Sequence, residues 1–442
     1  MQNEVIGFVE QLHQNVVIDD MTFILETIFE NTKFWKFNNI TEEKLVAATN
    51  KGLKIFEVKV DSVILSKKPE DYQLTLDSKT FEVKISGAKS VLTYFLSFKW
   101  EATSLGLHIA FGKGVLEYKN NIFSASYNPV NSESKLNISG NMDLKNLTGK
   151  GILNSGIEAW IKNRVNDLNK DLEEAMNYNK NFLHTYMHVN SKQLRRVLNG
   201  SSILDYNGTI FKVVENKNYY TYLYKVKLYL NKTYLSDVTL GIEVPSEASH
   251  DVSFYIPSQY IPLTIDAYGR AHQCDERVDL KNLNLTGTVK DLFIAVPELY
   301  SIYNGDESLE MHCMYGHNGA NTGLPENRME LPATCYFTVE NKTVLSSDFE
   351  FNMIYDPIEK NGVFKTEMKE ASITKCTTDS QSMTAAMFLI DIFDKLRRNK
   401  FTNKTLDIPK INYAPRDSSK FNATNKVVDG IFVSQFNYKK VP

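Results

Sequence analysis

The stretch "SVLTYFLSFKWEATSLGLHIAFGKGVLEYKN", residues 90–120, alternates apolar and polar side chains over an unusual length. The residues that would share one face of a first strand are Leu92, Tyr94, Leu96, Phe98 and Trp100. After a short break the same alternation resumes at Leu105, Leu107, Ile109 and Phe111. A period of two over this length predicts long antiparallel strands with one apolar face. The rest of the fold must cover that face.

Four segments show the helical period instead of the strand period. The first begins near residue 19, where Asp19 is a plausible N-cap, and its apolar stripe is Met21, Leu25, Ile28 and Phe29. The second runs from about 154 to 176, with Trp160 beside a stripe of Ile157, Ile161, Val165, Leu168, Leu172 and Met176. A short third helix would present Ile261, Ile265 and Tyr268, and a fourth would present Met383, Met387, Ile390 and Phe393. The closing "VVDGIFVSQFNYKKV" is typical of a final strand.

The order helix, long strands, helix therefore occurs twice. It predicts an α+β fold of two tandem domains, each a long, strongly curved antiparallel sheet wrapped around a long helix, joined by a central sheet. The expected bounds are 1–181 for the first domain, 182–245 for the central sheet and 246–442 for the second domain, whose last strands can return to the central sheet. A tubular apolar cavity forms if helix and sheet stay apart, and none forms if they pack directly. The pattern leaves both outcomes open.

Composition excludes several classes of protein. With 442 residues, 42% hydrophobic and 23% charged, the chain is long enough for two folded cores. A net charge of −3 lacks the basic footprint of a nucleic-acid-binding protein. No apolar run reaches the length of a membrane span, and the N-terminus has no signal-peptide pattern, so we expect either a cytosolic protein or one whose signal has been removed.

Cysteines and glycosylation sequons favour the secretory pathway or the extracellular space. The four cysteines allow two disulfides. Cys313–Cys335 is the preferred pair, because both residues lie in strand-like segments separated by a polar loop, and Cys274 and Cys376 remain. Four reduced thiols are the alternative. Ten Asn-x-Ser/Thr sequons occur, although an Asn-rich chain supplies many by chance. They are Asn39, Asn137, Asn146, Asn199, Asn207, Asn231, Asn284, Asn341, Asn403 and Asn422.

No catalytic motif is present in the sequence. We find no nucleophile elbow, no phosphate-binding loop, no His-Glu-x-x-His and no dinucleotide fingerprint, so we expect no enzymatic activity and no cofactor. The nearest approach to a metal site is "AHQC" with "MHCMYGH", but the spacing of His272, Cys274, His312, Cys313 and His317 is irregular. We therefore expect no metal there.

The order of elements resembles the two-domain tubular lipid-binding family, which includes bactericidal/permeability-increasing protein, lipopolysaccharide-binding protein and the plasma lipid-transfer proteins. The stretches that carry the likeness are "FEVKISGAKSVLTYFLSFKWEA", "SGNMDL" with the helix after it, "HDVSFYIPSQYIPLTIDAYGRA" and "KFTNKTLDIPKI". The resemblance implies non-enzymatic binding, and possible transfer, of phospholipid or another acyl-chain lipid in one apolar pocket per domain. It also implies transient contact with membrane surfaces.

The resemblance assigns site residues by position. The first pocket would use Ile18, Met21, Leu25, Phe29, Leu92, Tyr94, Leu96, Phe98, Ile157, Trp160, Ile161 and Val165. The second would use Ile261, Ile265, Tyr268, Met383, Met387, Ile390 and Phe393. Ordinary core packing is the alternative for each residue.

Two other functions fit the same scaffold. One is an extracellular structural or assembly module with filled pockets. The other is recognition of microbial glycolipid, which the near-neutral charge disfavours.

Overall fold

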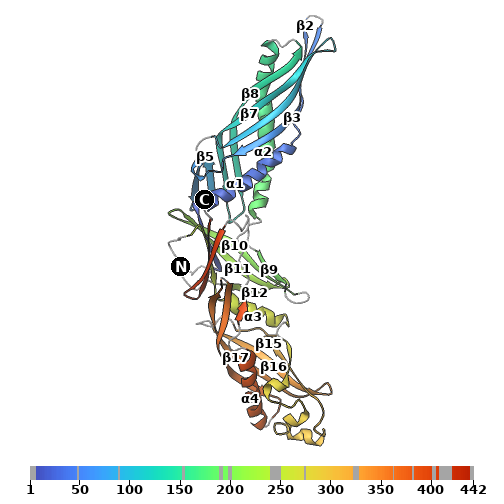
Figure 1. Cartoon of the computed structure of the whole chain (residues 1–442), viewed down its shortest axis with the longest axis vertical. Helices are drawn as coiled ribbons and strands as arrows, with labels where there is room; N and C mark the ends of the chain where they lie inside the picture. The colour runs from blue at the N-terminus through green and yellow to red at the C-terminus, as the bar shows by residue number, and fades with distance from the viewer. Residues whose placement is uncertain are drawn as a thin grey trace. The chain divides into compact units, whose positions relative to one another are not determined.

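The chain forms two compact units in the computed structural model (Figure 1). The α1–α2 unit comprises Leu12–Ser191 and Ile210–Tyr222, and the α3–α4 unit comprises Met1–Gln11, Lys192–Thr209 and Leu223–Pro442. The structure describes residues 6–46, 49–87, 90–151, 155–188, 193–197, 202–238, 250–272, 275–321, 328–361, 363–380, 383–400, 405–407 and 421–438.

The α1–α2 unit is built on one curled antiparallel sheet (Figure 1). Its strand order is β2-β3-β6-β7-β5-β4, and β8 pairs with β7. The strands are β2 (Ile40–Val46), β3 (Thr49–Leu65), β4 (Tyr72–Asp77), β5 (Glu82–Gly87), β6 (Leu92–Ser104), β7 (Leu107–Tyr127) and β8 (Ser134–Gly151). Short 3-10 turns η1 (Asn31–Phe34) and η2 (Pro69–Asp71) precede β2 and β4.

The apolar face predicted for residues 92–100 is confirmed. Along β6 every second side chain from Leu92 to Ala102 is buried, as expected for a strand with one covered face. The predicted continuation at Leu105, Leu107, Ile109 and Phe111 does not belong to that face, because these side chains are 49–71% exposed and Phe111 pairs with Glu101, whereas buried Trp100 pairs with Gly112. The alternation there is real, but its apolar side faces solvent in the described structure.

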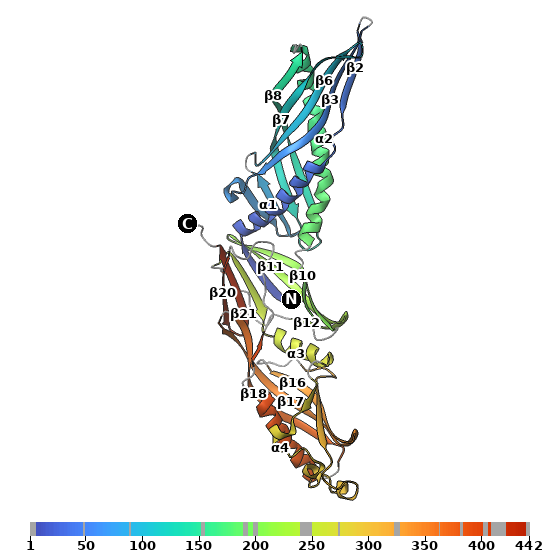
Figure 2. The same cartoon turned by 45° about the vertical axis from the view of Figure 1, so that its right-hand side comes forward.

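Helices α1 (Gln14–Glu30) and α2 (Ser155–His188) cover the same face of this sheet (Figure 2). They contact each other, and α2 also packs on β8. The whole predicted stripe of α2, from Ile157 to Met176, is buried. The predicted start of α1 at Asp19 is wrong, because β1 (Phe8–His13) leads directly into the helix and the His13 imidazole accepts the Asn15 amide hydrogen bond as N-cap.

The chain forms two further antiparallel sheets. One has the order β20-β21-β13-β1-β11-β10-β9, with β12 paired to β11, and the other has the order β14-β15-β16-β17-β18-β19. The strands of the first are β9 (Gln193–Val197), β10 (Ile203–Asn216), β11 (Tyr219–Leu230), β12 (Thr233–Val238), β13 (Val252–Pro257), β20 (Phe421–Val428) and β21 (Ile431–Tyr438). Those of the second are β14 (Glu276–Val278), β15 (Leu309–Tyr315), β16 (Arg328–Val339), β17 (Lys342–Lys360), β18 (Val363–Thr378) and β19 (Thr405–Asp407).

Helices α3 (Tyr260–Arg270) and α4 (Met383–Lys400) belong to the α3–α4 unit, with 3-10 turns η3 (Leu280–Leu283), η4 (Val289–Leu292) and η5 (Pro297–Ser301). Helix α4 packs on β18, and its buried side chains include Ala385, Leu389, Ile392, Phe393 and Leu396. The closing segment predicted as one strand is a hairpin, β20–β21. Its turn is Asp429-Gly430, where both φ angles are positive. An Asp-Gly dipeptide between apolar runs is the strongest short-range sequence signal for a hairpin.

The preferred disulfide is present. Cys313 on β15 and Cys335 on β16 are directly opposite in register and are bonded to each other. Cys376 on β18 is a free thiol near the Ser347 hydroxyl, at 3.6 Å, and Cys274 lies outside the described residues.

The broad fold class is confirmed: within the described ranges the chain is mostly antiparallel sheet with four α-helices. The closing strands β20 and β21 do join the sheet that contains β9–β12. The domain bounds 1–181, 182–245 and 246–442 stay predictions. None of the helices in the described ranges combines the length and apolar character that crossing a bilayer requires.

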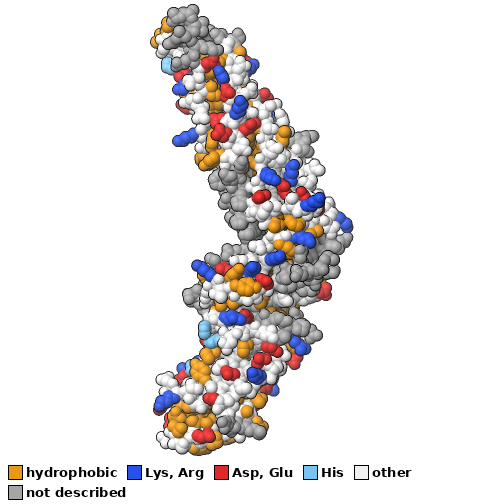
Figure 3. Space-filling model, turned by 180° about the vertical axis from the view of Figure 1, so that it is seen from behind, with side chains coloured by type: hydrophobic (Ala, Val, Ile, Leu, Met, Phe, Trp, Pro, Cys, Tyr) orange, Lys and Arg blue, Asp and Glu red, His pale blue; other side chains and the backbone are white. Residues whose placement is uncertain are grey.

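A second group of exposed apolar side chains lies on the α3–α4 unit. Ile294, Tyr300 and Ile302 are 66–75% exposed, and the Tyr300 ring stacks on Phe293 with centroids 3.9 Å apart. Figure 3 shows hydrophobic side chains gathered at the end of this unit that carries the short 3-10 turns. Each unit therefore presents its own apolar surface group to solvent.

Candidate functional site

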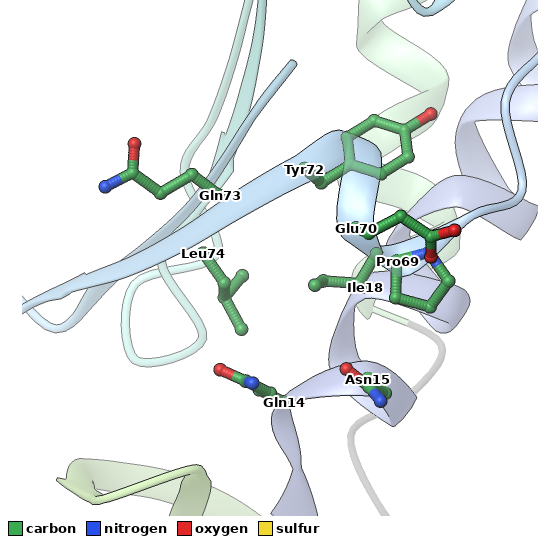
Figure 4. Close-up of a pocket in the computed structure, with 8 residues that line it drawn as sticks. All are labelled: Gln14, Asn15, Ile18, Pro69, Glu70, Tyr72, Gln73 and Leu74. Atoms are coloured by element: carbon green, nitrogen blue, oxygen red, sulfur yellow. The ribbon is translucent and has the colours of Figure 1, made fainter. Parts of the chain in front are cut away.

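An open cavity of about 610 Å³ lies between the first turns of α1 and the η2–β4 segment of the α1–α2 unit (Figure 4). Ile18 and Leu74 face the space between helix and strand, and Gln14 and Asn15 lie along its α1 side. The full lining is Gln14, Asn15, Ile18, Pro69, Glu70, Tyr72, Gln73 and Leu74. Cavities that hold small ligands usually have volumes of about 300–1,000 Å³.

Four of the eight lining residues are apolar and four are polar. Ile18 and Tyr72 are buried and Leu74 is half-buried, whereas Glu70 and Gln73 are exposed. This division matches an amphipathic ligand whose apolar part enters the cavity while its polar part stays in water.

Local hydrogen bonds fix the wall formed by η2 and β4. Pro69 begins η2, where its missing N–H removes no helical hydrogen bond. The Tyr72 hydroxyl donates to the Ser66 carbonyl oxygen at 2.7 Å, and the Ser66 hydroxyl donates to the Asp71 carboxylate. The Tyr72 ring is therefore held in place in this wall, and burial raises the pKa of its hydroxyl.

A continuous row of aromatic rings extends from Tyr72 into the interior. Its successive centroid distances are 6.1 Å for Tyr72–Phe123, 6.4 Å for Phe123–Phe29, 6.4 Å for Phe29–Tyr94 and 6.0 Å for Tyr94–Tyr118. These edge-to-face contacts link α1 to strands β4, β6 and β7. The cavity is thus backed by the aromatic core of the unit.

Two buried hydroxyl groups mark the far end of this row. Tyr94 and Tyr118 are fully buried, and within the described part of the chain neither hydroxyl has a hydrogen-bond partner. Thr32 lies beside Tyr94, but its hydroxyl donates to the Phe29 carbonyl oxygen at 2.5 Å. Burial raises both pKa values, and at Tyr118 the nearby Glu173 carboxylate adds to the rise. Both tyrosines are therefore neutral donors at physiological pH.

The residues predicted for the first pocket are brought together in this unit. All except Trp160 are buried between the two helices and the sheet. Trp160 is half-buried, and its indole N–H donates to Glu42, which also accepts from Arg164 at 2.9 Å. Ile18 is the member of the set that lines the open cavity. Ligand contact by the others stays a prediction.

The residues predicted for the second pocket are more scattered. Ile261 and Phe393 are buried, Ile265 and Tyr268 are half-buried, and the Met383 side chain lies outside the description. Met387 and Ile390 are 68% and 48% exposed. The predicted α4 stripe is therefore confirmed only at Phe393, whose ring stacks on Phe349 with centroids 4.0 Å apart, and Leu389 and Ile392 are buried outside the stripe.

Sequence reasoning did not find most of the cavity lining. Pro69, Glu70, Tyr72 and Leu74 come from a short turn and edge strand with no motif of their own. Their role depends on α1 lying against them, and α1 is 39 residues or more away in the chain. The alternation in "YQLTLD" was the available signal, and it shows only that Tyr72 and Leu74 share a face.

Most of the glycosylation sequons that can be placed are accessible. Asn39, Asn137, Asn146, Asn231, Asn284 and Asn341 are exposed. Asn207 is half-buried. Asn422 lies in β20 but its side chain is not among those described, and Asn199 and Asn403 lie outside the described residues.

Comparisons with known proteins give structural likenesses at low identity. No family model matches the chain, and no curated protein matches it at the threshold applied. The crystal structure of lipopolysaccharide binding protein is similar with a TM-score of 0.44 and 11% identity, covering 99% of this chain and 100% of that one. P47 from Clostridium botulinum A2 has a TM-score of 0.29 and 9% identity, covering 98% and 97% of the two chains. P47 of Clostridium botulinum E1 has a TM-score of 0.31 and 11% identity, covering 98% and 99%.

Proposed function

We propose that the protein is a non-enzymatic lipid carrier whose α1–α2 unit takes up the acyl part of a phospholipid or a similar amphipath. The observation that supports this most directly is the open cavity between α1 and β4, with its exposed polar side chains, buried Ile18 and Tyr72, and aromatic row behind. Such a lining binds through apolar contact and needs no fixed charged site.

The energetics favour exchange with membranes. Each CH₂ group kept out of water preserves about 0.8 kcal/mol, whether it lies in a bilayer or in a protein interior. Moving a tail from one to the other therefore loses little hydrophobic free energy. The polar head group would stay at the rim near Glu70 and Gln73, which are exposed.

The exposed apolar groups are proposed as the membrane contacts. In the α1–α2 unit these are Leu105, Leu107, Ile109 and Phe111 at the β6–β7 turn. In the α3–α4 unit they are Ile294, Tyr300 and Ile302. Side chains of this kind at a turn insert into the headgroup and acyl boundary of a bilayer without spanning it. The accessible sequons and the Cys313–Cys335 disulfide support an extracellular setting.

The first measurement is native mass spectrometry of the purified protein, followed by organic extraction and identification of any lipid. Bound phospholipid would support the proposal. A lipid-free chain that also fails to bind a fluorescent phosphatidylcholine would refute it and favour the assembly module.

A matched pair of variants locates the binding. Leu74 and Leu76 are half-buried on the same face of β4, but only Leu74 belongs to the cavity lining. We expect Leu74→Trp to fill the cavity and weaken binding of the fluorescent lipid by about tenfold or more, and Leu76→Trp to leave it unchanged. Equal effects of the two variants would show that the lipid does not use this cavity.

A further inference from the structure

Three metal-ligating side chains from separate segments converge in the α3–α4 unit. His272 follows the end of α3, Asp275 precedes β14, and His317 follows β15. Their ligand atoms all lie within 4.8 Å of one another. The Asp275 carboxylate is 2.5 Å from His317 Nε2 and 3.3 Å from His272 Nδ1, and the centroids of the two imidazole rings are 3.9 Å apart.

The backbone is built to bring these segments together. Gly269 in α3 and Gly316 after β15 are packed so closely that a Cβ on Gly269 would lie 2.7 Å from the Tyr315 carbonyl oxygen. His272 itself has a φ of +58°, a left-handed conformation that a residue with a Cβ rarely adopts, and this turns the chain at the end of the helix. Two close glycines and one unusual backbone angle thus place His272 beside His317.

A buried network holds the same loops from behind. The Arg270 guanidinium donates to both carboxylate oxygens of Asp266, at 3.0 and 3.1 Å. The buried Asp266 carboxylate also accepts the Ala320 backbone N–H at 2.5 Å. The segment after β15 is therefore tied to α3 independently of the two histidines, whose hydrogen-bond contacts are with Asp275.

The donor set and its spacing fit a transition metal. Zinc sites with open coordination positions use three protein ligands, commonly histidine with a carboxylate. Metal–ligand bonds of about 2.0–2.2 Å in a tetrahedron separate neighbouring donor atoms by about 3.3–3.6 Å. The 3.3 Å between His272 Nδ1 and the Asp275 carboxylate already matches this spacing, and the 2.5 Å between Asp275 and His317 Nε2 would have to widen by about 1 Å.

The cluster offers the kinds of donor atom that zinc sites use. Imidazole nitrogen suits zinc among the transition metals, and a carboxylate oxygen is a further zinc ligand.

We propose that His272, Asp275 and His317 bind one Zn²⁺ ion, which links the end of α3 to the end of β15. His272 is 65%, Asp275 35% and His317 22% exposed at the side chain, so the metal would keep at least one position open to water. This site is separate from the lipid cavity, which lies in the other unit.

The test uses the full-length chain stripped with EDTA and titrated with Zn²⁺ against a chromophoric chelator. We expect one zinc per chain and a higher melting temperature when zinc is added, because an ion that binds the folded state alone stabilises it. Two variants should each lower the affinity for zinc by more than about tenfold: Asp275→Asn, which keeps the size of the side chain, and the His272→Ala/His317→Ala double variant. Loss of a residue that only supports a metal ligand already costs about tenfold or more, so loss of a ligand should cost at least as much.

His108→Ala is the matched control. His108 is 64% exposed and lies 3.4 Å from the Glu101 carboxylate, but among the described residues it belongs to no cluster of three metal-ligating side chains. This variant should bind zinc with unchanged affinity. Absence of a one-to-one complex, or equal affinity in the control and the His272/His317 double variant, would overturn the proposal. If the double variant does not fold, the Asp275→Asn result decides.

Discussion

Replacing Leu107 and Phe111 together by threonine should weaken binding to neutral phospholipid vesicles without destabilising the fold. Both side chains lie on the solvent face of β7, 71% and 55% exposed. Threonine keeps the strand propensity of the segment and removes most of its apolar surface.

The exposed fractions set the size of the effect. Complete burial of a Leu or Phe side chain is favourable by about 1.5–3 kcal/mol. Scaled by exposure, insertion into the bilayer would contribute about 1–2 kcal/mol for each side chain, and their joint loss corresponds to about 30- to 600-fold in the partition coefficient.

Co-sedimentation with phosphatidylcholine vesicles measures this coefficient, and urea denaturation measures the free energy of unfolding. The control is the pair Ile64→Thr and Ile122→Thr, which removes side chains that are 56% and 52% exposed on the same sheet but outside the β6–β7 turn. A partition coefficient that does not change in the Leu107/Phe111 variant, or that falls equally in the control, would refute the assignment of this turn as a membrane contact.

Four further outcomes are expected. Leu105→Asn should raise the free energy of unfolding by up to about 1 kcal/mol, because Leu105 has a φ of +55° that asparagine tolerates better. Binding to vesicles should fall in the same variant, and a loss of stability would contradict the expectation. Tyr118→Phe should raise the stability of the lipid-free chain by about 1 kcal/mol, because a buried hydroxyl without a partner among the described residues costs desolvation; a decrease would show that the hydroxyl is satisfied in solution. Replacing Cys313 and Cys335 by alanine should lower the free energy of unfolding by about 3 kcal/mol, given their separation of 22 residues, as denaturation with and without reductant would show. The hydrogen bond from Arg397 lowers the pKa of Asp394 below 3.8. The ionised carboxylate therefore stabilises the fold above that pH, and this contribution is lost as pH falls through the lowered pKa. Asp394→Asn should remove this part of the acid dependence of the melting temperature.

The chain's periodicity was sufficient to predict local structure. The alternation from Leu92 to Trp100 and the stripe from Ile157 to Met176 predict a half-buried strand and an amphipathic helix, and both are confirmed. The pairing of Cys313 with Cys335 also followed from sequence, because two strands joined by one loop are neighbours.

What covers each apolar face depended on the tertiary structure. Leu107 and Phe111 repeat the alternation of β6, yet both are exposed, and the register pairs Phe111 with Glu101 on the face of the sheet opposite to buried Trp100. Helix α4 offers apolar residues on more than one side, and its contact with β18 buries Leu389 and leaves Met387 exposed. Periodicity tells which residues share a face, whereas burial depends on elements far away in the chain.

The two candidate sites follow the same rule. Ile18 and Leu74 are 56 positions apart, and His272 and His317 are 45 positions apart, so no local pattern relates the members of either pair. The sequence by itself determined the residue types, the strands and the helices that carry them. Only the packing of α1 against β4, and of the end of α3 against the end of β15, brought those side chains together, because contacts between distant segments are set by the burial of the whole chain.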